Sequence, residues 1–511
     1  VQTCALPIWL VKGKGKGEYL LERIPGKEQK ISGSRRSAVM IDSYSHVGEG
    51  VGRINGKAVF IPDALRGELV SFKLIEEKKS YARGQLIEVL TPSAERLTPP
   101  CPSYRECGGC QLQQMSYQEQ LHFKGDQVRA SLERIGGLHG LTVQPVLGME
   151  YAEGYRHTAR FHLSLNSRQI RAGFHGLKSH SLADASCCRL LPPEFPRLLA
   201  MVVELLEQSW DLQRYPVSEI VLRKGLKSGE LLAVLHADRL PPELAPSQLI
   251  TGICRSVPRC VGVAAVAKSR TSAANNGRHR RSGQTNSQDR DLIVLYGRDY
   301  YLEEVCGTRF RVPAAAFFQN NPRQAEALVQ IVRSCCRPRK DDTLLDLYCG
   351  VGLFSLNLAQ AVSYIYGIEE KEAATEAAGE NSLNNGIKNA SFHTGKVEKL
   401  LPQLRNGTFR PDTVLLDPPR TGCSAEALQG ILQLAPQKII YVSCNPATLA
   451  RDLRRLTAEI YQVDLVQPVD MFPQTFHVEC VVLMSRSGAT QTSTDTTHAI
   501  AVQEAEPHGE G

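Results

Sequence analysis

Cysteine is the residue type in this 511-residue chain that most plainly offers chemistry, since the chain contains 15 of them. Cys101, Cys107 and Cys110 form the pattern C-x5-C-G-G-C, and the glycines allow the tight turns that would let the thiolates converge on one metal centre. A fourth ligand must come from elsewhere, and Cys187 and Cys188 are the nearest candidates downstream. Zinc and an iron–sulfur cluster both take four thiolates, so the spacing leaves both open; three free core cysteines are the less favoured interpretation.

A second candidate site is a glycine turn for a nucleotide. Residues 342–355 read as an apolar strand, a Gly-x-Gly turn and the start of a helix, and a second strand is expected at 361–367. Glu369 follows that strand, where a carboxylate suits the hydroxyls of a ribose. Ser355 stands in place of the third glycine of the dinucleotide fingerprint, which favours S-adenosylmethionine over NAD without excluding NAD.

Two further strands are expected to end in reactive groups. Asp417 closes the apolar run that begins at Thr413, and Asp417-Pro-Pro is followed by Arg420. Methyltransferases that act on exocyclic amino groups carry an aromatic residue there, so Arg420 argues against that chemistry. Cys444 follows the next apolar run and could act as a thiolate nucleophile, although taken alone an inert buried cysteine is the better interpretation.

His477 and Glu479 lie near the beginning of the last expected strand. Residues two apart on a strand share a face, so both could point towards one site. On pattern alone, a surface pair is as well supported as a catalytic one.

The elements that must position these groups change in type along the chain. Residues 38–92 read as short strands with an Asn-Gly hairpin at 54–57, which fits a small barrel carrying basic side chains such as Lys73 and Arg83. From residue 338 onward strands alternate with helices, which predicts a parallel sheet.

Composition is that of an ordinary globular protein, with 42% hydrophobic and 22% charged residues and a net charge of +7. Most of the positive excess falls in residues 1–37 and 269–291, so binding of any polyanion would depend on local patches. No stretch is apolar enough to span a membrane, and the odd number of cysteines without a convincing secretory signal disfavours a disulfide framework. We expect a cytoplasmic protein.

Taken in order, these motifs resemble those of the RNA uracil-C5 methyltransferases, and in particular the branch that acts on 23S ribosomal RNA and carries an N-terminal TRAM domain. The resemblance runs from about residue 38 to residue 486. The motifs that carry it are the cysteine pattern, Phe317-Phe-Gln319, Leu345-Asp-Leu-Tyr-Cys-Gly-Val-Gly352, Asp417-Pro-Pro-Arg420, Ser443-Cys-Asn-Pro446 and His477-Val-Glu479.

The resemblance implies a role for individual residues. It makes Cys444 the nucleophile, which attacks C6 of uracil, and Glu479 the base, which removes the C5 proton. It also implies a target base flipped out of its stack. The implied ligands of a [4Fe-4S] cluster are Cys101, Cys107, Cys110 and Cys188, and the implied S-adenosylmethionine contacts are Gln319, Tyr348, Glu369 and Asp417. Departures from the family pattern are Leu353, where many relatives have Asn, His157, where Asn is usual, and a long insertion at 269–291.

The fold that this implies is α/β: a Rossmann-like class I methyltransferase domain, an N-terminal OB-like TRAM β-barrel and a central α+β iron–sulfur domain. The expected parts are a flexible basic extension (1–37), the barrel (38–95), the central domain (96–310) with the inserted loop, the methyltransferase domain (311–486) and a disordered tail (487–511).

Other functions stay open. The same reaction on transfer RNA is the first alternative, disfavoured because those relatives typically lack the TRAM domain and the cluster cysteines. A catalytically silent RNA-binding protein and an NAD dehydrogenase are the others. The expected partner is 23S ribosomal RNA, with no membrane and no obligate protein partner.

Overall fold

The structure is a computed structural model that describes residues 36–166, 169–177, 179–209, 211–240, 252–253, 257, 259–268 and 290–487. The expectations for the basic extension, the inserted loop and the tail fall almost entirely outside these residues. The described chain divides into two compact units, the first made of the residues up to Pro100, Cys110–Phe123 and Gln474–Phe476, and the second of the remainder. Each unit is described by itself.

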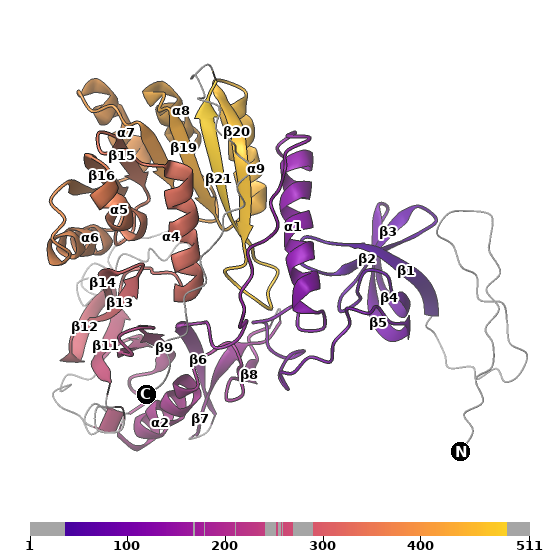
Figure 1. The fold of residues 1–511 in the computed structure, drawn as a ribbon. Coiled ribbons are helices and arrows are strands. Elements are labelled where there is room, and N and C mark those ends of the chain that lie inside the picture. The colour runs from indigo at the N-terminus through magenta and orange to yellow at the C-terminus, as the bar shows by residue number, and fades with distance from the viewer. Residues whose placement is uncertain are drawn as a thin grey trace, which may run out of the picture. The chain divides into compact units, whose positions relative to one another are not determined.

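The first unit contains a closed barrel whose strands follow the order β1-β2-β3-β5-β4 (Figure 1). The hairpin predicted at 54–57 is confirmed, because Asn55 (φ 50°) and Gly56 (φ 76°) both take the left-handed conformation that a tight two-residue turn requires. Val39, Ile61 and Phe72 contribute to the buried interior. The strands are β1 (Arg36–Tyr44), β2 (Gly50–Ile54), β3 (Lys57–Ile61), β4 (Leu69–Glu77) and β5 (Tyr81–Thr91).

Helix α1 (Tyr117–Arg134) begins in the first unit and ends in the second. In the first unit its Phe123 packs in an apolar cluster with Leu65, Leu112 and Met115, and Phe476 lies against that cluster. Gln120 holds the neighbouring segment, since its amide donates to Gln474 Oε1 (3.0 Å) and its Oε1 accepts from the Gln474 N–H (2.9 Å).

The second unit begins with a seven-stranded, mostly antiparallel sheet in the order β12-β11-β10-β9-β6-β7-β8. Helix α2 (Glu194–Ser209) covers one face, and its Phe195 and Val202 pack against Phe161 and Leu235 of the sheet. A hairpin of β13 (Tyr300–Val305) and β14 (Thr308–Pro313) follows. The sheet strands are β6 (Thr158–Asn166), β7 (Gln169–His175), β8 (Leu182–Asp184), β9 (Val217–Lys224), β10 (Leu231–Ala237), β11 (Cys260–Lys268) and β12 (Arg290–Gly297).

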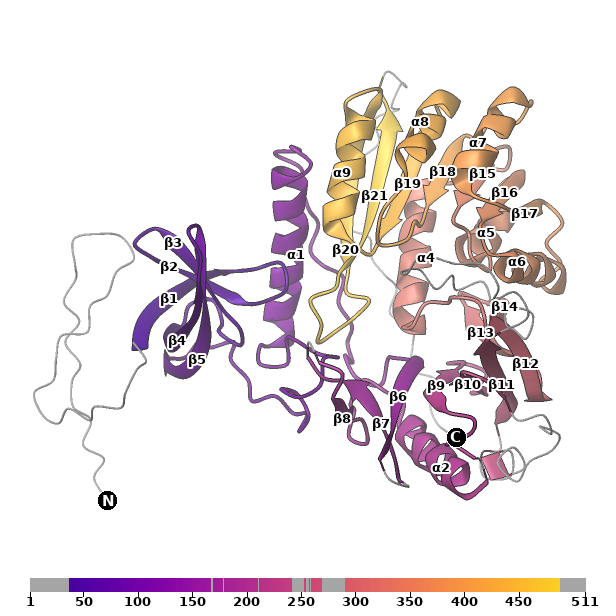
Figure 2. The same cartoon turned by 180° about the vertical axis from the view of Figure 1, so that it is seen from behind.

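The parallel sheet predicted after residue 338 is confirmed in the order β17-β16-β15-β18-β19-β21-β20, with β21 and β20 antiparallel at one edge (Figure 2). The chain runs outward from β15 to β17 and then returns to β18, so the switch in direction lies between β15 and β18, where such sheets bind ligands. The strands are β15 (Thr343–Leu347), β16 (Tyr364–Glu369), β17 (Ala390–Thr394), β18 (Thr413–Leu416), β19 (Lys438–Ser443), β20 (Tyr461–Val469) and β21 (Glu479–Arg486).

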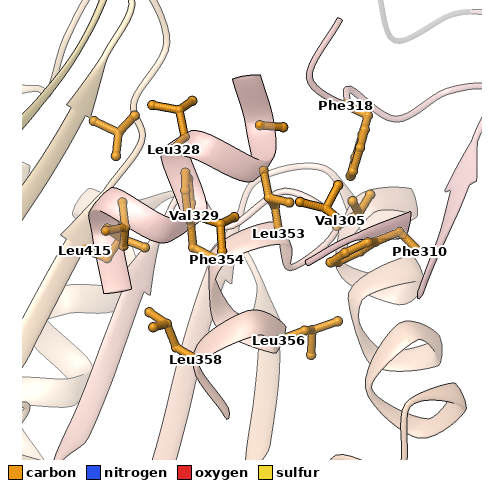
Figure 3. Packing of buried hydrophobic residues seen from close by; sticks show 14 of the residues in the cluster. Val305, Phe310, Phe318, Leu328, Val329, Leu353, Phe354, Leu356, Leu358 and Leu415 are labelled. Atoms are coloured by element: carbon orange, nitrogen blue, oxygen red, sulfur yellow. The ribbon is translucent and has the colours of Figure 1, made fainter. Parts of the chain in front are cut away.

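Apolar side chains that alternate along these strands belong to two separate cores, one on each face of the sheet. Leu344 and Leu415 pack with α4, α5 and α6, and Leu345 and Val414 pack with α7, α8, α9 and the second half of α1. Figure 3 shows the first of these cores around Leu353 and Phe354. The helices are α4 (Pro322–Cys336), α5 (Leu353–Leu358), α6 (Glu372–Asn384), α7 (Val397–Asn406), α8 (Ala425–Leu434) and α9 (Pro446–Thr457).

One strand differs from its predicted bounds. The second strand was expected at 361–367, but β16 begins at Tyr364, because a 3-10 turn over Ala359–Ala361 continues the helical segment before it. Among the described helices, none is long and apolar enough to cross a membrane.

Candidate active site

The loop after β15 is shaped by left-handed backbone. Tyr348 (φ 66°), Gly350 (φ 56°) and Gly352 (φ 87°) turn the chain sharply into α5. Glycine adopts this conformation freely. At Tyr348 the same conformation costs about 1–3 kcal/mol, which contacts with the neighbouring structure must offset. The N–H groups of Tyr348 and Cys349 donate to Ile368 O at 2.8 and 3.1 Å, which fixes the turn against the end of β16.

Glu369 lies at that end and is held by backbone donors. Its Oε2 accepts from the Gly350 N–H (3.2 Å) and its Oε1 from the Lys371 N–H (2.9 Å). The carboxylate is thereby fixed beside the glycine turn, as its predicted contact with a ribose requires.

Asp346 explains the missing third glycine. It is fully buried in β15, and Ser355, which replaces that glycine, donates its hydroxyl to Asp346 Oδ2. Burial raises the pKa of Asp346 to about 7. The serine therefore has a structural partner that the sequence did not reveal.

Asp417 follows β18 as predicted, and its N–H donates to Leu347 O at 3.3 Å. Burial raises the pKa of Asp417, and the nearby charges of Asp346 and Glu369 raise it further. Carboxyl groups from three neighbouring strands therefore lie around the turn. This donor set fits a cofactor that carries a cationic sulfonium.

Gln319 and Tyr348 are the other two predicted cofactor contacts, and they come from different segments of the second unit. Gln319 is buried in the segment between β14 and α4, and that segment is fixed where Arg223 donates to Ala316 O (2.8 Å) and the His157 N–H donates to Asn320 O (2.8 Å). Burial raises the pKa of Tyr348, whose hydroxyl also interacts with the Cys423 thiol.

Cys444 follows the last residue of β19 and precedes α9, whose N-cap Asn445 accepts from the Ala447 N–H (3.1 Å). Burial raises the pKa of the thiol to about 11; the charge of Glu479 adds to this, and the charge of Arg420 opposes it. The group is therefore a protonated thiol at neutral pH until its surroundings change.

Glu479 begins β21 opposite this cysteine. In the antiparallel pairing of β19 with β21, Ser443 faces Cys480, so the next position on each strand brings Cys444 towards Glu479. Burial raises the pKa of Glu479 well above its ordinary value, with Asp417 adding to the effect and Arg420 opposing it. A thiol and a carboxyl group thus share one end of the sheet, as a nucleophile and a base of the predicted reaction would need to.

The last strand begins later than expected: β21 starts at Glu479, so His477 precedes it. His477 Nε2 instead lies 3.4 Å from Arg420 Nη2. Burial lowers the pKa of His477 to about 4, and the charges of Arg420, Lys124 and Arg156 act in the same direction, so the imidazole is neutral at physiological pH.

Comparison with known proteins identifies the family. Residues 302–487 match the family described as tRNA (Uracil-5-)-methyltransferase, and residues 35–87 match the TRAM domain. An uncharacterized RNA methyltransferase of Clostridium tetani is 35% identical over 450 residues, covering 86% of this chain and 94% of the relative. The chain belongs to this methyltransferase family.

Two further comparisons agree. An uncharacterized RNA methyltransferase of Thermosynechococcus vestitus is 37% identical over 462 residues, covering 88% of this chain and 97% of the relative. The solved structure of a Pyrococcus abyssi tRNA (uracil-54, C5)-methyltransferase in complex with S-adenosyl-L-homocysteine superposes with a TM-score of 0.66 at 24% identity, covering 87% of this chain and 98% of that one. This chain therefore has the same fold as that methyltransferase.

Two residues of this methyltransferase's site were not assigned a role from the sequence. Asp346 is the first, and its signal was a carboxylate in the middle of an apolar strand, flanked by Leu345 and Leu347. Arg420 is the second: the sequence shows only that it replaces an aromatic residue, whereas the structure places its charge beside Cys444, which follows a different strand.

The cysteines proposed as metal ligands are divided between the two units. In the second unit, burial raises the pKa of Cys188, and the thiols of Cys107 and Cys101 contribute, so these three lie near one another. The Gly109 N–H donates to Cys107 Sγ at 3.3 Å, and a Cβ at Gly109 would occupy the space beside that sulfur. Cys110 belongs to the first unit.

The sulfur atoms of these thiols are the type of ligand that a soft metal centre prefers. Across the described ranges, however, no group of three or more His, Cys, Asp or Glu side chains is arranged to hold a metal ion. The cluster therefore stays a prediction from the sequence. None of the described cysteines forms a disulfide.

Proposed function

We propose that this protein transfers a methyl group to C5 of a specific uridine in 23S ribosomal RNA. The observation that carries the proposal is the pairing of Cys444 with Glu479 at the end of the sheet that also carries Asp346, Glu369 and Asp417. S-adenosylmethionine, when bound, supplies the methyl group as an electrophile. Tyr348, Glu369, Asp417 and Gln319 are the residues that we propose to contact it.

The proposed reaction explains why both a thiol and a carboxylate are needed. Uracil C5 is too weak a nucleophile to accept a methyl group unaided. Attack of the Cys444 thiolate at C6 forms a carbon–sulfur bond and makes C5 nucleophilic, so C5 takes the methyl group. Glu479 then removes the C5 proton, and the C6–S bond breaks to release Cys444.

The charges around Cys444 support a substrate-dependent activation of the thiol. Its pKa is raised by burial and by Glu479 and lowered by Arg420. A positive charge beside Asp417 and Glu479 would offset the negative charges of these two carboxylates, which oppose ionisation of the Cys444 thiol. We therefore expect thiolate formation to follow binding and not to precede it.

The test is methylation of RNA transcripts in vitro, with tritium release from 5-labelled uridine as the readout. We expect the wild-type protein to release tritium and Cys444→Ala to release none and to form no covalent adduct. Glu479→Gln should accumulate the adduct because the C5 proton stays in place. If Cys444→Ala still methylated uridine at C5, the scheme would be wrong, and a silent wild-type protein would favour an RNA-binding role alone.

Transfer RNA is the second candidate substrate. The description of the family that residues 302–487 match names tRNA as the substrate. The Pyrococcus abyssi protein of the same fold is a tRNA (uracil-54, C5)-methyltransferase. The 23S proposal is supported by the combination of a TRAM domain with the cysteine pattern. Parallel assays with 23S fragments and tRNA transcripts, followed by mapping of 5-methyluridine, distinguish the two.

We also propose that Cys101, Cys107, Cys110 and Cys188 ligate a [4Fe-4S] cluster. The proposal is supported by the spacing of the first three and by the proximity of Cys101, Cys107 and Cys188; for Cys110 it rests on the sequence alone. Iron and sulfide analysis with an absorbance spectrum of anaerobically purified protein tests it. Stoichiometric zinc without iron would overturn it.

A further inference from the structure

A cavity in the seven-stranded sheet region lies outside the candidate active site. It has a volume of about 410 Å³ and is enclosed by α2, the end of β9, the turn before β10 and the residues just before β11. None of the residues proposed for catalysis or cofactor binding lines it. Its size is within the range of about 300–1,000 Å³ that is usual for small-ligand sites.

The lining combines an apolar floor with a cationic rim. Leu198, Met201 and Leu231 form part of the floor, and Leu198 and Leu231 are almost fully buried. Arg197 and Arg259 are exposed on the rim. This combination suits a flat aromatic base that carries a phosphate, because the ring can lie on the apolar floor and the anion between the guanidinium groups.

Two further contacts shape the rim. Arg259 donates to Ser228 O at 3.2 Å, and Gly229, which is left-handed (φ 67°), leaves the space that the guanidinium occupies. Lys224 pairs with Glu194 at 2.8 Å, so the carboxylate of Glu194 is neutralised and the rim keeps an excess of positive charge.

The cavity wall is connected to the segment that carries Gln319. The Lys224 N–H donates to His157 O (2.9 Å), and the His157 N–H donates to Asn320 O (2.8 Å). Two hydrogen bonds thus join the cavity to the residue after Gln319. A ligand at Lys224 would therefore lie close to the segment that carries Gln319.

We propose that this cavity binds one unpaired nucleotide of the RNA substrate, with its base on Leu198, Met201 and Leu231 and its phosphate between Arg197 and Arg259. The proposal rests on the proposed function for the identity of the ligand as RNA. The site holds the RNA at a second point while the target uridine enters the active site.

The test compares RNA binding by two double variants. Arg197→Glu/Arg259→Glu reverses the rim, and Arg214→Glu/Arg239→Glu is the matched control, because both of its arginines are exposed and lie outside the cavity. Dissociation constants are measured for the RNA at one salt concentration. We expect the rim variant to bind about tenfold more weakly and the control to stay within about twofold of wild type.

Two measurements keep the test independent of folding and of turnover. Met201→Trp fills the cavity without changing charge and should weaken RNA binding in the same direction. RNA containing 4-thiouridine should crosslink to cavity residues of the wild-type protein. Because neither needs methyl transfer, RNA binding that depends on the cavity would stand even if the wild-type protein released no tritium.

Three results would overturn the proposal. The first is equal weakening by the rim variant and the control, which would indicate general charge attraction. The second is unchanged RNA affinity in both the rim variant and Met201→Trp. The third is saturable binding of a free mononucleotide such as UMP in the cavity with no effect on RNA affinity, which would indicate a small-molecule site.

Discussion

Cys444 is the proposed nucleophile, and its surroundings in the free protein oppose its ionisation. Burial and Glu479 raise the pKa of the thiol to about 11, whereas Arg420 is the nearby group that favours the thiolate. The proposed reaction needs the same carboxylate later as a base, so the two effects of Glu479 conflict in the free protein. Such a conflict is resolved if substrate binding changes the charge at the site.

The first prediction concerns the reactivity of this thiol. Replacing Glu479 by Gln removes a negative charge, so the pKa of Cys444 should fall; replacing Arg420 by Ala removes a positive charge, so it should rise. The measurement is the rate of alkylation of Cys444 by iodoacetamide as a function of pH, followed on its own peptide by mass spectrometry.

The exposed Cys306 provides the internal control, because both substitutions should leave its alkylation profile unchanged. Shifts of the Cys444 profile in the same direction for both variants would contradict the electrostatic account.

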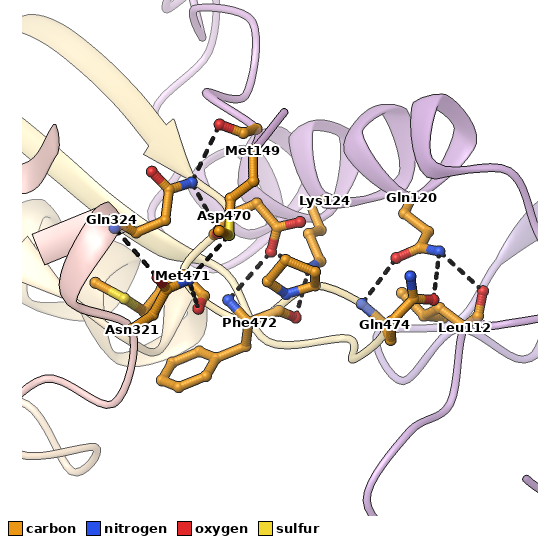
Figure 4. A network of polar contacts seen from close by, with 12 residues as sticks. Leu112, Gln120, Lys124, Met149, Asn321, Gln324, Asp470, Met471, Phe472 and Gln474 are labelled. Atoms are coloured by element: carbon orange, nitrogen blue, oxygen red, sulfur yellow. Dashed lines mark hydrogen bonds and ion pairs between the residues drawn. The ribbon is translucent and has the colours of Figure 1, made fainter. Parts of the chain in front are cut away.

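At the scale of elements, the segment between β20 and β21 is held by several neighbours before it delivers Glu479 (Figure 4). Lys124 of α1 donates to Asp470 Oδ1 (2.5 Å) and to Phe472 O (3.0 Å), and both charged side chains are fully buried. Gln324 of α4 donates to Asp470 O at 3.0 Å, and Asn321 donates to Met471 O at 3.0 Å. The path of the chain towards the base is therefore fixed by α1 and α4.

The second prediction follows from the buried ion pair. Lys124→Met leaves Asp470 buried without its counter-charge and should lower the free energy of unfolding by about 3–5 kcal/mol. Lys124→Met/Asp470→Leu removes both charges and should recover most of that loss. Urea unfolding followed by circular dichroism measures both.

Arg129→Met is the control, since it breaks an exposed ion pair with Asp126 (2.8 Å) and should cost no more than about 1 kcal/mol. A double variant as unstable as Lys124→Met would show that the pair itself, and not the unpaired charge, carries the stability.

Local signals in the sequence were enough for the strand ends that carry Asp417 and Cys444 and for the Asn-Gly hairpin. An apolar run that stops at a polar residue predicts a strand terminus, and Asn-Gly predicts a two-residue turn. The pairing of Lys124 with Asp470 could not be predicted, because these residues are 346 positions apart and neither belongs to a motif. The sequence pattern predicts His477 on the strand, because period-two spacing does not show where hydrogen bonding begins.

At the scale of the whole molecule, the chain leaves the second unit at Pro473, contributes Gln474–Phe476 to the first unit and returns at His477. Within the first unit, Gln474 is bonded to Gln120 and Phe476 lies against the cluster of Leu112 and Phe123. The barrel unit thus includes residues just before the proposed base, Glu479. Because the chain is continuous from Phe476 to Glu479, a change in the folding of the first unit can shift the position of Glu479.

The third prediction tests this route with Phe476→Ala. Removing the ring frees the segment three residues before Glu479, so kcat should fall by about tenfold or more because the base is positioned less well. The affinity for S-adenosylmethionine should stay within about twofold, since none of its proposed contacts lies in the first unit. Leu97→Ala, at a half-exposed position of the same unit (50%), should leave both quantities unchanged. An unchanged kcat in Phe476→Ala, with the barrel unit still folded by circular dichroism, would show that the base is positioned from the second unit alone.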